Sequence, residues 1–147
     1  MLKNIIIILS LLIGQQIFSQ ELQTKWFYSI NRADDGSFIL NLKAEIPDIY
    51  YMYGMNIKEG PLPLEFSFEN AENFLIEYNF SEITVPKKVF DDVFGVEVST
   101  YHGLAEFQCK FIPKENISSL NLIIDGQLCN KKDGSCFPLR KEIKVNF

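Results

Sequence analysis

The sequence has few of the residues from which metal sites and activated nucleophiles are built. It contains one histidine, His102, and three cysteines, with no CxxC pair and no pair of histidines. Zinc sites need several such ligands at short spacing, so we expect no metal and no cofactor. A Ser/His/Asp set, a phosphate-binding loop and a supported pair of catalytic carboxylates are also missing, which leaves hydrolytic and nucleotide-dependent chemistry without candidates.

The sequence also has no excess of positive charge. Its 147 residues carry a formal net charge of −5, and no basic stretch stands out. Because nucleic-acid binding requires Lys and Arg to neutralise phosphates, this balance argues against DNA or RNA as a partner. The sequence shows no internal repeat, no low-complexity segment and no second apolar run long enough to span a membrane.

The first apolar run has the features of a secretory signal, which we assign to residues 1–19. Lys3 supplies the positive start, residues 5–13 are almost entirely apolar, and Ser19 is the small residue at the expected cleavage position. The run is shorter than the ~20 residues that span a bilayer. An uncleaved membrane anchor is the alternative interpretation.

Cleavage would leave residues 20–147 as a single domain and change the net charge from −5 to −6, because Lys3 is lost. A chain of this length can bury a core of ordinary size. We expect a soluble domain in an oxidising extracytoplasmic compartment, periplasmic or secreted, where a disulfide can persist.

Short alternations of apolar and polar residues, separated by turn signals, run through this domain. In residues 37–46, for example, every second side chain from Phe38 to Ala44 is apolar. Only residues 69–77 have a weak helical pattern. Strands are predicted at residues 24–30, 37–46, 50–57, 65–69, 74–80, 96–101, 105–112, 120–125 and 142–147. The pattern predicts an all-β fold, an immunoglobulin-like antiparallel β-sandwich, with a closed barrel of strands as the alternative.

Two cysteines near the C-terminus lie where the arms of a predicted hairpin meet its turn. Cys129 and Cys136 are separated by six residues that include Asp133-Gly134, a strong turn signal. Such a hairpin can bring the two sulfurs within bonding reach. The pair is either a structural staple, which would contribute about 2.5 kcal/mol in the chain-entropy estimate, or a redox centre.

The residues between the two cysteines bear on this choice. Lys131 and Lys132 would favour a thiolate, whereas Asp133 opposes it. The loop is polar and we expect it to be exposed, as an exchanging pair must be, because attack on a disulfide needs access to a sulfur. The staple and the redox centre both remain open on these residues alone.

Cys109 and His102 are given structural interpretations. Cys109 alternates with Phe107 and Phe111 on one face of a predicted strand, which indicates a buried and inert thiol. His102 lies in a Tyr-His-Gly context typical of a strand end or a turn, and we assign it no catalytic role.

The C-terminal segment, in which Cys129 and six further residues precede Cys136-Phe137-Pro138, resembles the N-terminal periplasmic domain of the thiol:disulfide interchange protein DsbD. Residues 90–95 (FDDVFG) are similar to the acidic-aromatic cap loop of that family, and residues 50–53 (YYMY) to its tyrosine-rich strand. The three matches occur in the family's order and cover nearly the whole mature chain. The resemblance implies an immunoglobulin-like sandwich with a redox-active cysteine pair.

The resemblance also implies roles for particular residues. Cys136 would form mixed disulfides with partner proteins, and Cys129 would resolve them. The residues implied to cap the pair are Asp91, Asp92, Val93 and Phe94. Those implied to flank it are Tyr51, Tyr53, Phe137 and Pro138. From the residues alone, the two aspartates can equally belong to a solvated turn, and the two tyrosines to the core.

The sequence departs from the family pattern in three places. The spacing between Cys129 and Cys136 is one residue longer than usual. Leu139 stands where a second proline is common, and Val93 stands where the cap commonly has a second aromatic residue.

The implied activity is thiol-disulfide exchange of the protein-disulfide reductase type, within a relay of several proteins. A thioredoxin-like protein or a membrane electron-conducting protein would reduce the pair, which would in turn reduce oxidised periplasmic proteins. Because the sequence ends at Phe147, we expect the donor to be a separate protein. The alternative is a non-catalytic secreted β-sandwich, a binding or structural module with Cys129–Cys136 as an inert staple, which fold alone cannot distinguish.

Overall fold

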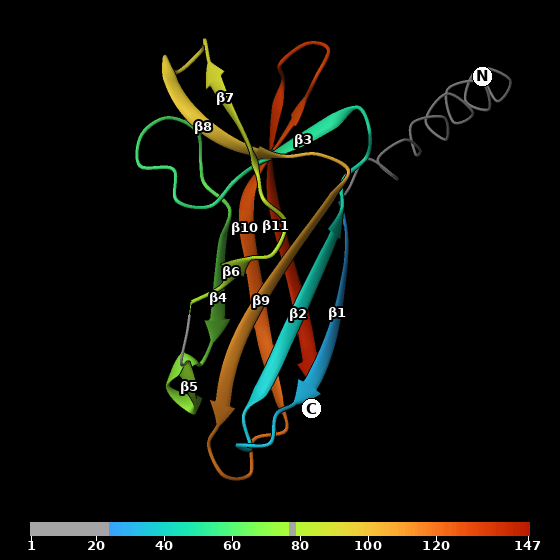
Figure 1. The fold of residues 1–147 in the computed structure, drawn as a ribbon, viewed down its shortest axis with the longest axis vertical. Coiled ribbons are helices and arrows are strands. Elements are labelled where there is room, and N and C mark those ends of the chain that lie inside the picture. The colour runs from blue at the N-terminus through green and yellow to red at the C-terminus, as the bar shows by residue number, and fades with distance from the viewer. Residues whose placement is uncertain (1–23, 77–78) are drawn as a thin grey trace, which may run out of the picture.

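A computed structural model describes residues 24–76 and 79–147, which form two antiparallel β-sheets packed face to face (Figure 1). The first sheet contains, in spatial order, β1 (Lys25–Arg32), β2 (Phe38–Glu45), β9 (Leu104–Pro113) and β5 (Phe74–Ile76), with β6 (Ser81–Glu82) also paired to β9. The second contains β11 (Cys136–Asn146), β10 (Ser119–Asn130), β3 (Tyr50–Tyr53), β8 (Val96–Tyr101) and β7 (Lys87–Asp91), with β4 (Glu65–Glu69) also paired to β10. The predicted immunoglobulin-like β-sandwich is confirmed.

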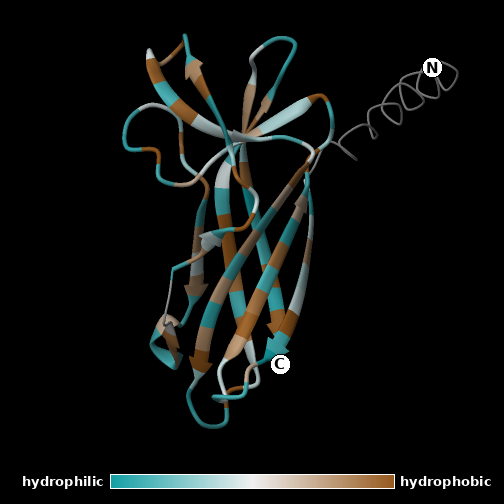
Figure 2. Cartoon of the chain, viewed as in Figure 1, coloured by the Kyte–Doolittle hydropathy of each residue, from teal (hydrophilic) through white to brown (hydrophobic). Residues whose placement is uncertain are grey.

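The core between the sheets follows from the two-residue alternation of the strands. Leu40 and Leu42 on β2 share the inner face of the first sheet with Phe107 and Phe111 on β9, and all four side chains are almost completely buried. Figure 2 shows the matching alternation of hydrophobic and hydrophilic residues along these two strands. Burying one such side chain contributes about 1.5–3 kcal/mol, so the alternation fixes which face of each strand turns inward.

Strand β10 connects the elements of the second sheet. It pairs with β11 along nearly its whole length, from Ser119 opposite Asn146 to Cys129 opposite Cys136. Its other edge pairs first with β4 and then, over its last three residues, with β3. The strand therefore runs from the lower part of the sandwich to the end where β3, β7 and β8 lie (Figure 1).

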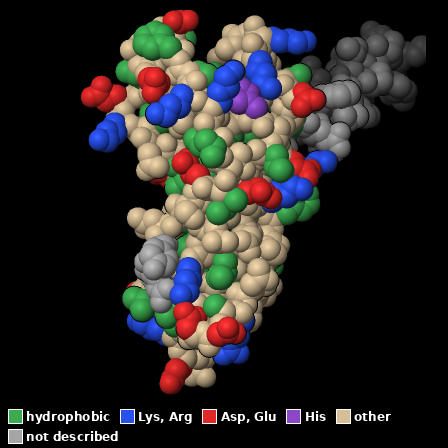
Figure 3. Space-filling model, in the orientation of Figure 1, with side chains coloured by type: hydrophobic (Ala, Val, Ile, Leu, Met, Phe, Trp, Pro, Cys, Tyr) green, Lys and Arg blue, Asp and Glu red, His purple; other side chains and the backbone are tan. Residues whose placement is uncertain are grey.

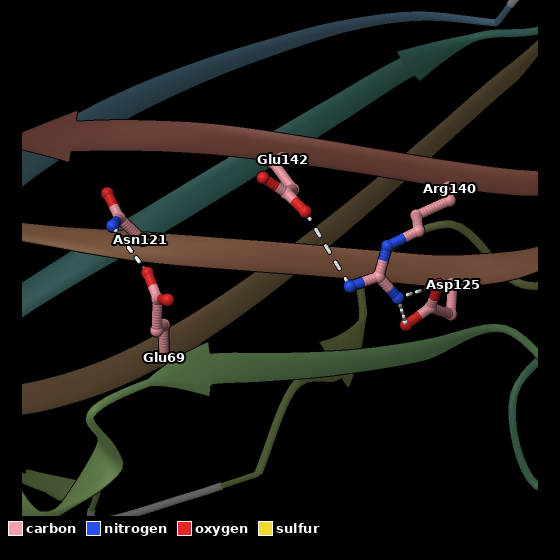
Figure 4. Close-up of polar contacts among 5 residues, drawn as sticks. All are labelled: Glu69, Asn121, Asp125, Arg140 and Glu142. Atoms are coloured by element: carbon pink, nitrogen blue, oxygen red, sulfur yellow. Dashed lines mark hydrogen bonds and ion pairs between the residues drawn. The ribbon is translucent and has the colours of Figure 1, made fainter.

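The outer face of the second sheet carries a ladder of polar contacts (Figure 4). The Arg140 guanidinium donates to both carboxylate oxygens of Asp125, at 2.9 and 3.0 Å, and lies 3.6 Å from a Glu142 oxygen. On the neighbouring strands, the Asn121 amide donates to the Glu69 carboxylate at 2.7 Å. These side chains are solvent-exposed, so each contact stabilises the fold by at most about 1 kcal/mol.

The third predicted strand, residues 50–57, is shorter than expected and ends at Tyr53. A Cβ atom at Gly54 would collide with the Ser99 side chain, and Asn56 has φ +60°. A left-handed residue cannot continue a strand, so residues 54–64 leave the sheet as a loop.

Other elements also differ from the sequence-based expectations. The possible helix at residues 69–77 is reduced to the 3₁₀ turn η1 (Ala71–Asn73), followed directly by β5. Strands β6 and β7 were not predicted, and both β10 and β11 extend to the cysteine loop. The proposed signal at residues 1–19 lies outside the described residues. Within the described ranges, no helix is long and apolar enough to cross a membrane.

Candidate redox site

The structure joins Cys129 and Cys136 by a disulfide of 2.04 Å at the end of the β10–β11 ladder. The two residues are directly opposite each other, with Cα atoms 4.0 Å apart. This separation is close to that of a non-hydrogen-bonded antiparallel pair, so the register of the two strands alone places the sulfurs side by side.

Residues 130–135 close the hairpin with turn chemistry that the sequence signals. The Asn130 amide donates to the Ser135 carbonyl at 2.8 Å, and the Gly134 amide donates back to the Asn130 carbonyl at 3.0 Å. Gly134 has φ +71°, a conformation that suits glycine. Hydrogen bonds from the Ser135 hydroxyl and amide hold the Asp133 carboxylate and lower its pKa.

The disulfide lies on the outer face of its sheet, away from the main core. The neighbouring residue Leu128 points inward and packs in the core, whereas Cys129 points to the other face. There Cys129 is fully buried in a small separate cluster with Tyr53 and Val98. Cys136 packs at the margin of this cluster and remains partly exposed. The two sulfurs therefore differ in access.

Two tyrosines of β3 cover the disulfide on the side facing β8. Tyr51 is the direct partner of Cys129 across the β3–β10 ladder, and its ring contacts that of Tyr53 edge to face, with centroids 5.4 Å apart. The two hydroxyl oxygens are 3.4 Å apart. The predicted tyrosine-rich flank is thus beside the pair, and β3 supplies it because residues 51 and 53 share one face.

The Tyr53 hydroxyl donates a hydrogen bond to the Asp91 carboxylate at 2.6 Å. Burial, followed by this hydrogen bond, raises the pKa of Tyr53. For Asp91, burial acts to raise the pKa, but hydrogen bonds from Tyr53 and from the Phe94 and Val93 amides outweigh it, and the net pKa is lowered. Asp91 is therefore ionised at neutral pH, and both of its carboxylate oxygens accept hydrogen bonds.

The segment predicted to be a cap loop forms the turn of the β7–β8 hairpin. Asp91 Oδ1 accepts hydrogen bonds from the amides of Val93 at 2.9 Å and Phe94 at 3.2 Å, while the Gly95 amide donates to the Asp91 carbonyl at 2.7 Å. Gly95 has φ +69°. The Asp92 side chain and 87% of Val93 are exposed to solvent.

Phe94 is an exposed hydrophobic residue, with a relative solvent exposure of 45%. It lies beside Gly60 in the loop after β3, since a Cβ atom built on Gly60 would be 3.3 Å from the Phe94 Cβ. The structure thus ties Asp91 to the tyrosines next to the disulfide and directs Phe94 toward the 54–64 loop.

The two residues after Cys136 point to different faces of β11. Pro138 is two residues from Cys136 and shares its outer face. Phe137 is paired with Leu128, on the opposite face from the disulfide, and is half exposed. Of the four predicted flanking residues, Tyr51, Tyr53 and Pro138 therefore share the face of the sulfurs.

His102, which was given no role from the sequence, lies against this site. Its ring stacks on that of Tyr51, with centroids 5.9 Å apart and planes 28° apart, and its Nε2 is 3.0 Å from the Thr100 hydroxyl. Burial, and then the charges of Lys131 and Lys87, lower the pKa of His102. The sequence holds no signal for this contact, because it depends on the pairing of β3 with β8.

Cys109 has the buried position that the sequence predicts. Its side chain is 1% exposed on β9, and burial raises the pKa of the thiol to about 11. Such a thiol is protonated and inaccessible at neutral pH. In the described part of the chain, no cluster of three or more potential ligand residues could hold a metal ion.

The sequence profile of the family described as thiol:disulfide interchange protein DsbD, N-terminal, matches residues 19–146. The chain belongs to this family. The disulfide, the tyrosines and the acidic turn therefore lie in a DsbD N-terminal domain. No curated protein sequence matches the chain significantly.

Solved structures share the fold of the chain. The reduced form of the Neisseria meningitidis DsbD N-terminal domain has 20% identity and a TM-score of 0.59, over 91% of this chain and 92% of that one. The complex of the Neisseria meningitidis DsbD and PilB N-terminal domains gives 19% identity and a TM-score of 0.51, over 90% and 88%. The N-terminal periplasmic domain of ScsB from Proteus mirabilis gives 13% and 0.60, and there the match covers 90% of this chain but 50% of the other.

Proposed function

We propose that Cys129 and Cys136 form a redox-active pair that exchanges thiols and disulfides with other extracytoplasmic proteins. The observation that carries the proposal is the position of the disulfide. It lies on an outer sheet face, with Cys136 partly exposed, in a chain that belongs to a thiol:disulfide interchange family. An exchanging disulfide must offer a sulfur to an incoming thiolate, and this one does so without opening the main core.

The exchange has two steps in each direction. A thiolate of a reduced donor attacks the Cys136 sulfur, the disulfide breaks, and Cys129 leaves as a thiolate that takes up a proton. The second thiol of the donor then attacks the mixed disulfide, so the donor is oxidised and the pair holds two electrons and two protons. In the reverse sense, the Cys136 thiolate attacks an oxidised substrate protein, and Cys129 resolves the product.

The difference in burial supports this order of roles. Cys129 is 0% exposed, whereas Cys136 is partly exposed. A partner can approach Cys136, whereas the buried Cys129 remains inaccessible to the partner and can act as the resolving cysteine. The β7–β8 turn, held by the Tyr53–Asp91 hydrogen bond, would act as the cap that limits access by small oxidants.

The donor is a thioredoxin-like protein or a membrane electron-conducting protein, and the acceptors are oxidised periplasmic proteins. The complex between DsbD and PilB domains of Neisseria meningitidis supports a protein partner of this kind. Residues 1–19 would direct the chain out of the cytoplasm, and residues 20–147 would be the exported domain.

An equilibrium titration tests the proposal against the inert staple. The variant Cys109→Ala, which contains only the pair, is equilibrated with dithiol buffers of known potential, and the pair is scored by alkylation and mass. The reduction potential of an exchanging pair in the folded protein should lie above about −300 mV, whereas the potentials of structural disulfides typically lie below that value. Reduction only after unfolding would show that the disulfide is a staple.

A further inference from the structure

A row of four side chains crosses the sheet from the disulfide to His102. Cys136 pairs with Cys129, Cys129 with Tyr51, and the Tyr51 ring stacks on His102. Neighbouring strands are about 4.8 Å apart, so His102 lies roughly 10 Å from the Cys129 position, two strands away. Cys136 lies one strand farther, roughly 14 Å from His102, and a protein docked over Cys136 can span this distance with side chains near its own reactive cysteine.

Two lysines border His102. The Thr100 hydroxyl lies 3.0 Å from His102 Nε2 and 3.3 Å from the Lys87 carbonyl oxygen, to which it donates, so the Lys87 backbone is held next to His102 on the β7 side. On the other side, Lys131 is held by its amide and its Nζ, which donate to the Ile49 and Asp48 carbonyls at 2.9 and 2.6 Å. Figure 3 shows basic side chains gathered around the single histidine at this end of the molecule.

The surface beside these groups is hollowed. A hollow of 390 Å³ is lined in part by Lys87, Thr100, His102 and the exposed apolar side chain of Val85. The site therefore offers two cationic or protonatable groups next to an apolar wall. A carboxylate on a short apolar stem, as in Asp or Glu, has the charge and shape for such a hollow.

We propose that this basic surface, defined as Lys87, His102 and Lys131, receives an acidic side chain that lies next to the reactive cysteine of the partner protein. The inference rests on the proposed exchange through Cys136 and adds the chemistry of the partner that the pair selects. The charge of the surface contrasts with the whole chain, whose net charge is −5.

Acidic side chains lie at the other end of strand β7 from this basic surface. At the far end of β7 from Lys87, the cap turn carries Asp91 and Asp92. A partner whose carboxylate approached that turn would be repelled, whereas the same carboxylate would be attracted over His102. Charge complementarity of this kind fixes the orientation of a partner and raises its association rate.

The test compares two peptides that differ only in charge. Each has one cysteine activated as a mixed disulfide with thionitrobenzoate and flanked by glutamates in one peptide and by lysines in the other. The Cys136 thiolate of the reduced protein attacks the peptide sulfur, and thionitrobenzoate leaves with the electron pair and is followed by its absorbance. We expect the glutamate peptide to react roughly tenfold faster at low salt, with the ratio approaching one at high salt.

The variant Lys87→Glu should remove or reverse this preference. Because a change in thiolate reactivity affects both peptides alike, the ratio of the two rates isolates the surface. Lys114→Glu makes the same change of charge in the loop between β9 and β10, at the opposite end of the sandwich, and should leave the ratio unchanged. A ratio near one in the unmodified protein, or the same ratio in both variants, would overturn the basic surface but leave the exchange intact.

The single histidine gives a readout that needs no reaction. Peptides with serine in place of the cysteine are added, and His102 is titrated by NMR. A carboxylate bound beside the ring should raise the pKa of His102 with the glutamate peptide only, and an unchanged titration would count against the site. Failure of both activated peptides to react with the folded, reduced protein would instead refute the proposed exchange itself.

Discussion

The Tyr53 hydroxyl donates a hydrogen bond of 2.6 Å to Asp91 and so connects the strand beside the disulfide to the turn of the β7–β8 hairpin. The two residues are 38 positions apart in the chain. Because Asp91 also accepts from the Val93 and Phe94 amides, one carboxylate both shapes the turn and fixes it to the sheet. The Tyr53–Asp91 contact therefore fixes the β7–β8 turn to the strand beside the disulfide.

Replacing that contact should release the turn without unfolding the domain. We expect Tyr53→Phe to lower the free energy of unfolding by about 1–2 kcal/mol, because a hydrogen bond to a charged but partly solvated group is lost. Exchange of the Phe94 amide hydrogen and the reaction of the reduced pair with small oxidants should both become faster. Tyr28→Phe, an exposed tyrosine of the other sheet, is the control. Unchanged amide exchange in Tyr53→Phe would show that the turn holds itself.

Phe94 should shield the sulfurs more than it supports the fold. Its side chain is 45% exposed, so Phe94→Ala should cost about 1 kcal/mol or less, compared with roughly 3–5 kcal/mol for a core Phe. The reduced pair should react faster with a small disulfide. Phe90→Ala, at a more exposed position in the same hairpin, should change neither quantity. A loss of stability typical of the core would remove Phe94 from the cap.

The division of labour between the two sulfurs can be read from trapped complexes. Cys129→Ala should still displace thionitrobenzoate from a thioredoxin-like protein whose single active-site cysteine is activated as that mixed disulfide, and the new mixed disulfide should then persist because the resolving thiol is missing. Cys136→Ala should give little complex, since the remaining sulfur is fully buried. Non-reducing gels separate the outcomes, because a partner without its own resolving cysteine cannot release itself from the complex. Trapping only with Cys136→Ala would reverse the roles.

Cys109 should remain unmodified throughout the redox cycle. With a pKa raised to about 11 by burial, its thiol has very little thiolate near neutral pH. Timed alkylation followed by mass spectrometry should label the pair after mild reduction, and label Cys109 only when denaturant is added. Early labelling of Cys109, at the rate seen for Cys136, would show that β9 opens locally in the native state.

The β-sandwich could be predicted because apolar and polar residues alternate along its core strands. Leu40 and Leu42 alternate with polar residues, and the structure buries them accordingly. Strand β7 (Lys87–Asp91) was missed because it lies at the edge of its sheet, where most of its side chains are exposed and no alternation is required.

The site was predictable where residues are close in the chain and not where strands meet. The turn signal at Asp133-Gly134 predicts the hairpin that brings the two cysteines together. The contact of His102 with Tyr51 depends on the pairing of β3 with β8, and nothing in the local sequence specifies that pairing. The same holds for the Tyr53–Asp91 bond, which joins two predicted segments whose mutual contact no local pattern reveals.

The β10–β11 ladder continues for ten residue pairs beyond the disulfide, from Leu128 opposite Phe137 to Ser119 opposite Asn146. Those backbone contacts hold the two cysteines opposite each other whether or not a bond joins their sulfurs. The reduced thiols therefore face each other at a high effective molarity, and closure of the ring needs no search by the chain. Once a partner is attached to Cys136, its release by Cys129 is a unimolecular step on a fixed frame, so the lifetime of the covalent complex should be short and independent of protein concentration.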